Sequence, residues 1–495
     1  MTTLDLLRPP APRLAAYSLG SAVREGRQRA LTRGEAVLVS VSERVAPCDP
    51  LALFSAMDQL PDRVFWEHRD REGGHRLSVA GLGVAYTLPS SSDHDFAEAA
   101  VGWRALIAGA VVEAPAARWG LGPLLLGGFS FDPQADHTAL WAGFPDADMV
   151  LPILILAIVD DEYWLTTSIV VRPEDDPNLL LDTAVRLRDQ ALTAAKATVL
   201  NGVDAGEPFT LQDAMPEVEW KKLVGEVARE VRHGTITKVV LARQVTIDLP
   251  DRAFNPGVAL NRLRHTFPDA FLFAVSRPNG GSGGPSRVFL GASPERLVRL
   301  RGGRLAASCL AGSMGRGADP AADDVLGARL LASPKDRTEH AVVAKMLAES
   351  LAPLCENLEI PDHPRLLRLS NVQHLSTPIA GTLKVRSDGT RPCILDLAAR
   401  LHPTPAVGGY PRPDALALIR RREQLDRGWY AGPIGWLDRQ GEGEFAVAIR
   451  SALLDGREAH LFAGCGIVGN SDPESEYRES CLKLKAMLGA LTGSD

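Results

Sequence analysis

Two pairs of acidic residues are spaced so that each could bind a metal ion. Asp336 and Glu339 lie three residues apart near the start of one predicted helix, and Glu476 and Glu479 do so in another. This spacing places both carboxylates of a pair on one helix face. Facing carboxylates repel each other without a cation between them, and Mg²⁺ prefers such oxygen ligands. Each pair alone also has a simpler explanation, because acidic side chains in a first turn stabilise the helix dipole.

Basic residues interrupt two apolar runs that otherwise have the pattern of buried strands. Lys238 stands at the head of "KVVLARQVTI", and Arg450 lies within "FAVAIRSALL". Burying an ammonium is costly unless it is paired or its pKa falls, so the lysine at this position needs an explanation. An arginine in the middle of a buried strand usually meets a carboxylate, often that of a ligand. Arg243, in the same run as Lys238, is expected to form a structural ion pair.

Glu295 and His374 are further candidates for proton transfer or ligand binding. Glu295 follows a strand-like run in "GASPERLV", where the alternative is an exposed glutamate in a turn. His374 in "NVQHLST" could equally be a histidine satisfied within the core. A Ser-His-Asp pattern with a GxSxG elbow between a strand and a helix is not present, which disfavours serine-hydrolase chemistry.

A glycine-rich segment precedes the last predicted helix, 473–491. It is "AGCGIVGN" (463–470), and Asp472 is the expected N-cap of the helix. Glycine-rich backbone leading into a helix N-terminus suits an anion such as a carboxylate. The segment lacks the GK[ST] of a nucleotide-binding loop, and "AGLGVA" (80–85) lacks the third glycine of a dinucleotide fingerprint.

The elements that carry these residues are strands and helices in mixed order. Without a clean βαβ alternation, the pattern favours an α+β architecture of mainly antiparallel sheets with helices outside. The polar segment 201–215 is the best candidate linker, and a Gly/Ser loop is expected at 278–286. The apolar run "MVLPILILAIVDDEYW" is too short for a membrane span and is predicted to be a buried strand.

Composition and charge exclude several classes of partner. The 495 residues carry a net charge of −7 without a basic run, which argues against nucleic acid or an anionic membrane as the main partner. The six cysteines are scattered, and the N-terminus lacks the pattern of a secretory signal. We therefore expect a cytoplasmic protein without a disulfide framework.

Together, the candidate segments resemble the chorismate-utilising enzyme family and, within it, the isochorismate synthases. The matching motifs occur in family order over about 216–492: "KVVLAR" (238–243), "FLGASPERLV" (289–298), "LAGSMGRG" (310–317), "SPKDRTEH" (333–340), "VQHLSTPIAGTL" (372–383), "LHPTPAVGGYP" (401–411), "DRGWYAGPIGW" (426–436), "FAVAIRSA" (445–452) and "AGCGIVGNSDPESEYRESCLKL" (463–484).

The resemblance implies one large α+β body of two packed, mainly antiparallel sheets flanked by helices. Residues 1–215 would complete the fold around a chorismate-binding core of residues 216–495, so the segment 201–215 would be a surface loop.

The resemblance also implies a magnesium site and a set of substrate contacts. Mg²⁺ would bridge the ring carboxylate of chorismate to Glu339 and Glu479, supported by Asp336 and Glu476. The expected substrate contacts are Gly464, Gly466 and Lys483 for the ring carboxylate, Tyr430 and Arg450 for the enolpyruvyl carboxylate, and Gly312, Ser313, His374 and Ala406 for the rest of the pocket.

The implied mechanism assigns the two proton transfers. Lys238 would be the general base that takes a proton from water as its oxygen attacks C2 of the ring. Glu295, on the opposite ring face, would be the general acid that protonates the departing C4 hydroxyl. From the resemblance, we expect burial to favour the neutral form of both groups.

Three positions separate the branches of the family. Lys238 stands where anthranilate-forming relatives typically have glutamine, and Ala311 stands where aminodeoxychorismate-forming relatives have a nucleophilic lysine. Both favour water as nucleophile and disfavour a glutaminase partner. Ala406 replaces the threonine usual in salicylate synthases, which favours isochorismate as the product, with salicylate synthase as the alternative. Chain length favours menaquinone over siderophore biosynthesis, and we expect a monomer.

Overall fold

The computed structural model describes residues 19–70, 74–88, 96–114, 118–200, 208–279, 286–368, 372–387 and 389–493. Within these ranges the side chains of Lys335, Glu339 and Val372 are not described. Most of the Gly/Ser loop expected at 278–286, and the first part of the expected linker at 201–215, lie outside the described residues.

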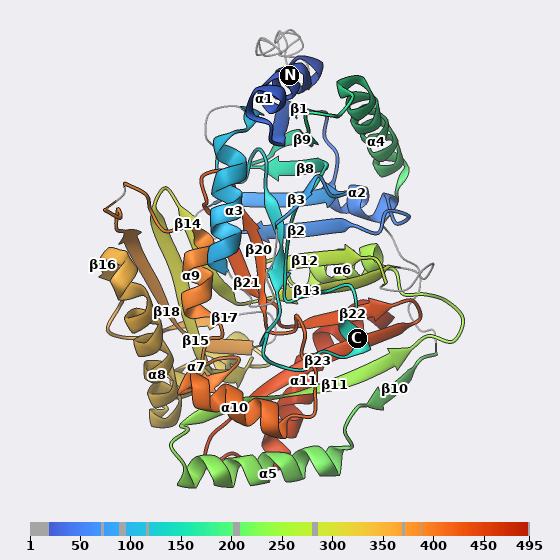
Figure 1. The fold of residues 1–495 in the computed structure, drawn as a ribbon. Helices are drawn as coiled ribbons and strands as arrows, with labels where there is room; N and C mark the ends of the chain where they lie inside the picture. Colours follow the sequence, from blue (N-terminus) through green and yellow to red (C-terminus); the bar gives the residue numbers. More distant parts are fainter. Residues whose placement is uncertain are drawn as a thin grey trace, which may run out of the picture.

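Two mainly antiparallel sheets form one body (Figure 1). The large sheet has 13 strands in the order β10-β11-β23-β22-β13-β12-β2-β3-β8-β9-β1-β5, with β19 beside β11. The small sheet has 10 strands in the order β16-β18-β15-β14-β21-β20-β6-β7-β4, with β17 beside β18. Both sheets combine strands from the first 200 residues with strands that follow, so the expected single α+β body is confirmed.

The strands of the large sheet are β1 (Val37–Arg44), β2 (Arg63–Arg69), β3 (Arg76–Leu82), β5 (Val111–Glu113), β8 (Leu154–Val159), β9 (Glu162–Val171), β10 (Thr210–Asp213), β11 (Lys238–Asp248), β12 (Phe271–Arg277), β13 (Arg287–Ser293), β19 (Gly409–Tyr410), β22 (Ser451–Asp455) and β23 (Glu458–Ile467). Those of the small sheet are β4 (Tyr86–Thr87), β6 (Leu125–Phe129), β7 (Ala147–Leu151), β14 (Arg296–Arg301), β15 (Arg304–Gly315), β16 (Cys355–Glu359), β17 (Arg365–Arg368), β18 (Val372–Leu383), β20 (Pro433–Leu437) and β21 (Gly443–Val447).

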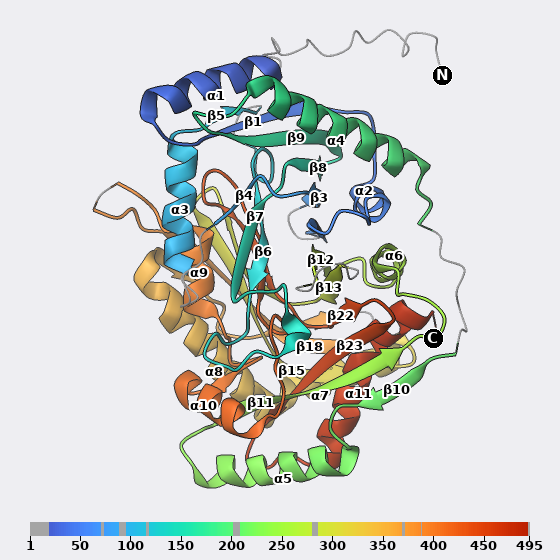
Figure 2. The ribbon, with the colours of Figure 1, turned by 45° about the vertical axis from the view of Figure 1, so that its right-hand side comes forward.

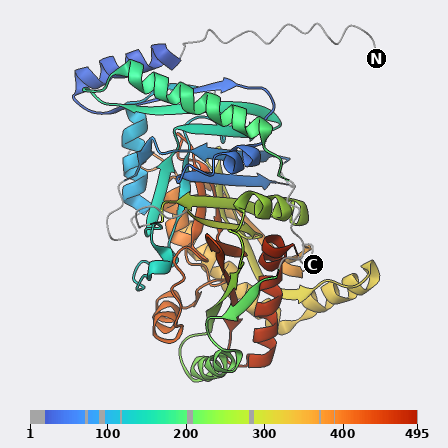
Figure 3. The ribbon, with the colours of Figure 1, turned by 90° about the vertical axis from the view of Figure 1, so that its right-hand side faces the viewer.

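Helices cover the outer faces of both sheets. They are α1 (Leu19–Arg33), α2 (Pro50–Ala56), α3 (Phe96–Ala108), α4 (Pro177–Ala197), α5 (Glu217–His233), α6 (Pro256–Thr266), α7 (Pro320–Ala332), α8 (Pro334–Leu351), α9 (Ile394–Leu401), α10 (Arg412–Arg422) and α11 (Pro473–Thr492). Helices α2, α4, α6 and α11 pack on the large sheet, whereas α7, α8 and α9 pack on the small one (Figure 2). Figure 3 shows α1 and α4 at one end of the large sheet and α5 at the other.

The main core lies between the two sheets, and a second core lies under the outer helices of the large sheet. Strand β12 illustrates both, because Phe271 and Phe273 belong to the first core while Leu272 and Ala274 belong to the second. Alternate side chains of a strand point to opposite faces. A strand that is buried on both faces therefore has the continuous apolar sequence seen here.

The structure corrects two expectations about strands. The run around Pro152 is not one buried strand, since β7 before the proline joins the small sheet and β8 after it joins the large one. Proline lacks the N–H that a continuous ladder needs. Residues 210–213 of the expected linker form β10, which pairs with β11. No helix in the described part of the chain is both long and apolar enough to cross a membrane.

Candidate active site

The candidate residues gather at one edge of four neighbouring strands. In the order β11-β23-β22-β13, adjacent strands are antiparallel, so the start of β11 and the end of β13 reach the same edge. Lys238 is the first residue of β11, and Glu295 lies two residues beyond β13. Three strand spacings separate β11 from β13, so the backbones of these two strands are about 14 Å apart. The side chains of Lys238 and Glu295 therefore approach the space between the two strands from opposite sides.

At this edge the chain crosses twice from one sheet to the other. Pro294 and Glu295 join β13 of the large sheet to β14 of the small one, and residues 448–450 join β21 to β22. The amide N of Ala292 donates to the carbonyl O of Arg450 (3.0 Å), and that of Val447 donates to the carbonyl O of Glu295 (3.0 Å). These bonds fix the backbones of Glu295 and Arg450 relative to each other.

The crossing corrects the expectation that Arg450 lies within a strand. Arg450 immediately precedes β22 and has a φ of 52°, in the left-handed region. This conformation costs a non-glycine residue about 1–2 kcal/mol. Strain of this kind is often found at functional sites.

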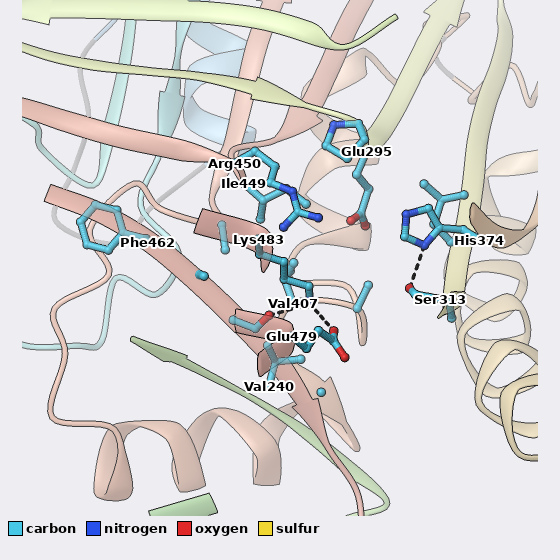
Figure 4. A pocket seen from close by; sticks show the side chains of 18 of the residues that line it. Val240, Glu295, Ser313, His374, Val407, Ile449, Arg450, Phe462, Glu479 and Lys483 are labelled. Carbon is cyan, nitrogen blue, oxygen red and sulfur yellow. Dashed lines mark hydrogen bonds and ion pairs between the residues drawn. The ribbon is translucent and has the colours of Figure 1, made fainter. Parts of the chain in front are cut away.

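One cavity of about 140 Å³ brings together twelve of the predicted site residues. They are Lys238, Glu295, Gly312, Ser313, His374, Ala406, Tyr430, Arg450, Gly464, Gly466, Glu479 and Lys483. They come from strands of both sheets, from the segments that connect strands, from the loop before β19 and from α11 (Figure 4). The fold thus brings together segments that are more than 200 residues apart in sequence.

The side chain of Lys238 is buried, with 8% of the residue exposed, and it lies against Gly466. A Cβ atom at position 466 would lie 2.6 Å from Cε of Lys238, closer than side-chain atoms approach. The glycine therefore leaves the space that the lysine side chain occupies along β23.

Glu295 is buried to the same extent, and its carboxyl group makes no hydrogen bond to any described residue. Burial raises its pKa to about 7, although Lys238, Lys483 and Arg450 lower it. Figure 4 shows the Glu295 carboxyl group and the Arg450 guanidinium pointing into the same space. A carboxyl group in this state can hold a proton near neutral pH and give it up to a ligand.

Lys483 is oriented by two partners. Its Nζ donates to Oε1 of Glu479 (2.6 Å), one helical turn earlier, and to the carbonyl O of Gly464 (2.8 Å). Burial raises the pKa of Glu479, but Lys483 and Arg450 outweigh this and hold it below its usual range. The cavity lining thus contains four lysines and arginines, Lys238, Arg427, Arg450 and Lys483, and favours an anionic ligand.

Tyr430 forms part of the cavity wall between the sheets. Its ring stacks on Phe462 with centroids 5.1 Å apart, and its hydroxyl would lie 3.2 Å from a Cβ at Gly464. Burial raises the pKa of Tyr430 to about 12, so the hydroxyl stays protonated and can donate a hydrogen bond to a ligand.

A bulge in the small sheet forms the opposite wall. The pairing of β15 with β18 shifts between Ala311 and Ser313, and Gly312 has a φ of 78°. Glycine adopts this conformation without strain. Nδ1 of His374 and Oγ of Ser313 are 2.8 Å apart. Burial, together with Arg450 and Lys483, lowers the pKa of His374 to about 4, so the imidazole is neutral at physiological pH.

Three potential metal ligands lie together beside the cavity. The ligand atoms of Cys465, Glu476 and Glu479 all lie within 4.8 Å of one another. Burial raises the pKa of the Cys465 thiol to about 12, which leaves the two carboxylates as the charged donors. Asp336 accepts a hydrogen bond from Ser333, the N-cap residue of α8, and lies against Gly312. The side chain of Glu339 is not described.

A buried ion pair at the cavity wall had not been expected from the sequence. Arg427 donates to both carboxylate oxygens of Glu423 (2.6 and 2.7 Å), to the carbonyl of Val240 (2.7 Å) and to that of Val407 (3.0 Å). Glu423 in turn accepts from the amide N of Ala242 (2.7 Å). The pair ties β11, which carries Lys238, to the loop that carries Ala406. Its only sequence signal is the four-residue spacing of opposite charges, which is common on any helix.

Arg243 forms the structural ion pair that was expected of it. It pairs with Asp213 of β10, and its Nε donates to Oγ of Ser480 (2.8 Å). The six cysteines, all within the described ranges, form no disulfide.

Comparison with known protein families gives a match over nearly the whole chain. The model of the family described as "Chorismate binding enzyme" matches residues 25–492. The chain belongs to this family. The resemblance found in the motifs is thereby confirmed.

Relatives in the family are similar along almost their full length. The salicylate biosynthesis isochorismate synthase of Pseudomonas aeruginosa is 41% identical over 473 residues, covering 94% of this chain and 92% of the relative. The isochorismate synthase MenF of Bacillus subtilis is 34% identical over 476 residues, covering 92% and 94%.

Solved structures share the fold of this chain. The menaquinone-specific isochorismate synthase MenF of Escherichia coli superposes with a TM-score of 0.73 at 24% identity, over 95% of this chain and all of the other. A putative 2,3-dihydroxybenzoate-specific isochorismate synthase, DhbC from Bacillus anthracis, gives a TM-score of 0.66 at 26% identity, over 87% and 96%.

Proposed function

We propose that the protein is an isochorismate synthase, which converts chorismate to isochorismate. The observation that carries this proposal is the meeting of Lys238 and Glu295 in one cavity, with the pKa of Glu295 raised to about 7. Two further basic residues, Arg450 and Lys483, suit a substrate that carries two carboxylates. The two relatives that match over more than 90% of their length share the name isochorismate synthase.

In the proposed reaction, Lys238 takes a proton from water while the water oxygen bonds to ring C2. The ring double bonds shift, and the C4–O bond breaks. Glu295 gives its proton to the departing C4 hydroxyl, so water enters and water leaves. Tyr430 and Arg450 bind the enolpyruvyl carboxylate and hold the ring so that base and acid act on it together.

The described residues fit a divalent cation, and we propose Mg²⁺ as the cofactor. Glu476 and Glu479 would hold it, because carboxylates are its preferred ligands and the protonated thiol of Cys465 is not. When bound, the ion supplies positive charge to the ring carboxylate of the substrate. The participation of Asp336 and Glu339 stays a prediction.

The runner-up function is salicylate synthase, in which isochorismate also loses pyruvate. Ala406 at the cavity wall disfavours it, through the resemblance stated above. The names of the relatives refer to both salicylate and menaquinone biosynthesis, and what the names share is the formation of isochorismate. We therefore propose the reaction itself, in a cytoplasmic enzyme that needs no glutaminase subunit, and leave the expected menaquinone pathway as a prediction.

Separation of the products tests the proposal. The purified protein is incubated with chorismate and Mg²⁺, with and without ammonium. We expect isochorismate in both arms, and none from variants Lys238→Ala and Glu295→Gln that retain the wild-type circular dichroism spectrum. Salicylate, anthranilate formed only with ammonium, or no turnover would each overturn it.

A further inference from the structure

A second cavity, of about 750 Å³, adjoins the candidate active site. We call it the outer groove. It shares five lining residues with the inner cavity, namely Ser313, His374, Arg450, Glu479 and Lys483. Its other lining residues come from α6, α11, the segments just beyond these helices and the end of β15. Leu482 in its wall is 59% exposed, so the outer groove lies between the protein surface and the inner cavity.

The two helices present one face each to the outer groove. Arg478, Leu482, Lys485 and Gly489 recur at the spacing that aligns residues on one side of a helix. Arg262 faces them from α6 and donates from Nη1 to the carbonyl O of Ala490 (3.0 Å). Helices α6 and α11 lie against each other near the C-terminus (Figure 2).

The lining of the outer groove is strongly basic, although the chain has a net charge of −7. Its charged residues are Arg262, Arg450, Arg478, Lys483 and Lys485, against the single carboxylate of Glu479. That carboxylate already pairs with Lys483.

The three outermost basic residues differ in how far their charge is compensated. Arg478, whose side chain is 75% exposed, pairs with Glu474 (3.0 Å). Glu474 does not line the groove. Arg262 donates to a neutral carbonyl. Among the residues that the structure describes, no carboxylate forms an ion pair with Arg262 or Lys485. The groove therefore retains positive charge along its path to the inner cavity.

We propose that the outer groove is the entrance for the substrate, and that Arg262, Arg478 and Lys485 attract it electrostatically. A cleft lined by charge of one sign raises the local concentration of an oppositely charged ligand. This inference rests on the proposed function, because chorismate carries two carboxylates. The three residues belong to the entrance and touch none of the reacting atoms.

Steady-state kinetics at two ionic strengths test the entrance. The variant R262Q/R478Q/K485Q is compared with R104Q/R186Q/K196Q, which removes three exposed charges from α3 and α4 and so has the same net charge. In about 20 mM salt we expect KM for chorismate to rise about five- to tenfold in the groove variant, with kcat within about twofold of wild type. In about 300 mM salt the difference should largely vanish, because surface charges are screened.

The outcomes separate the entrance from the proposed function. An unchanged KM in low salt, or an equal rise in the control variant, would overturn the entrance while isochorismate formation still stands. If removal of Arg262 disturbs α6, then R478Q/K485Q should still give a smaller rise in KM that salt abolishes. A wild-type protein that makes a different product from chorismate overturns the proposed function, and the same comparison of KM still decides the entrance.

Discussion

The backbone of Gly466 lies directly against the side chain of Lys238. A Cβ at position 466 would approach Cε of the lysine to 2.6 Å and its Nζ to 3.2 Å. The position of the proposed general base thus depends on the absence of a side chain on the neighbouring strand.

Gly466→Ala should therefore displace Lys238 and lower kcat/KM by about 10- to 100-fold, because small misplacements of catalytic groups are costly. The matched control is Gly225→Ala in α5, where the nearest atom to the added Cβ would be 3.5 Å away, an ordinary contact. Steady-state kinetics of both variants, with thermal melts to verify folding, provide the measurement. Wild-type activity in Gly466→Ala would mean that the position of Lys238 is not critical.

The pH dependence of activity should report the protonated form of Glu295. With a pKa of about 7, Glu295 loses its proton as pH rises through neutrality, so kcat/KM should fall above about pH 7. The pH–rate profile of the wild type provides the measurement. A profile that stays flat or rises between about pH 6 and pH 8 would argue against Glu295 as the acid.

The same residue should make stability depend on pH. Because the pKa of Glu295 is raised from 4.5 to about 7, the folded protein binds this proton more tightly than the unfolded chain does. The contribution is present at low pH and is lost as pH rises through 7; it amounts to about 3 kcal/mol. Glu295→Gln should therefore raise the melting temperature relative to wild type more at pH 8 than at pH 5, by calorimetry. A larger increase in melting temperature at pH 5 than at pH 8 would show that burial does not raise the pKa of Glu295.

The buried pair of Arg427 and Glu423 should behave as a coupled unit. Arg427→Met leaves an unpaired buried carboxylate and should destabilise the protein by about 3–5 kcal/mol. The double variant with Glu423→Met removes both charges and should recover part of this loss, as seen in denaturant unfolding. Activity should stay low in both variants, since β11 is no longer tied to the loop carrying Ala406. Equal stability of the single and double variants would contradict the coupling.

Substitutions at Glu476 and Glu474 of α11 form a matched pair that tests the proposed metal site. Glu476→Gln removes a proposed ligand and should raise the Mg²⁺ concentration for half-maximal activity about tenfold or more. Glu474 pairs with Lys221 and Arg478 on the exposed side of the helix, so Glu474→Gln should leave this concentration unchanged. Titration of activity with Mg²⁺ measures both. An equal effect of the two substitutions would refute a ligand role for Glu476.

The sequence was most informative where a charged residue stands beside an otherwise apolar strand. Lys238 and Glu295 stood out because charged residues flank apolar strands, and family motifs then related segments that are distant along the chain. The crossings between the sheets were not predictable in the same way. Arg450 has the apolar neighbours of a strand, but they belong to two strands of different sheets. The alternation of side chains does not indicate where a chain changes sheet.

The supporting contacts were also beyond the reach of the sequence. Arg427 and Glu423 act on β11 and on the loop before β19, and both partners come from distant parts of the chain. The outer groove depends on how α6 packs beside α11, which no local pattern specifies. Both the Arg427–Glu423 contacts and the outer groove therefore depend on long-range packing, which the sequence motifs do not specify.

The central claim is that Lys238 and Glu295 direct water to C2 of chorismate and release the C4 hydroxyl. Turnover of chorismate with Mg²⁺ in ¹⁸O-labelled water, followed by chromatography and mass spectrometry of the product, tests it most directly. The account predicts isochorismate that carries one labelled oxygen at C2. Unlabelled isochorismate, or a different product, would contradict it.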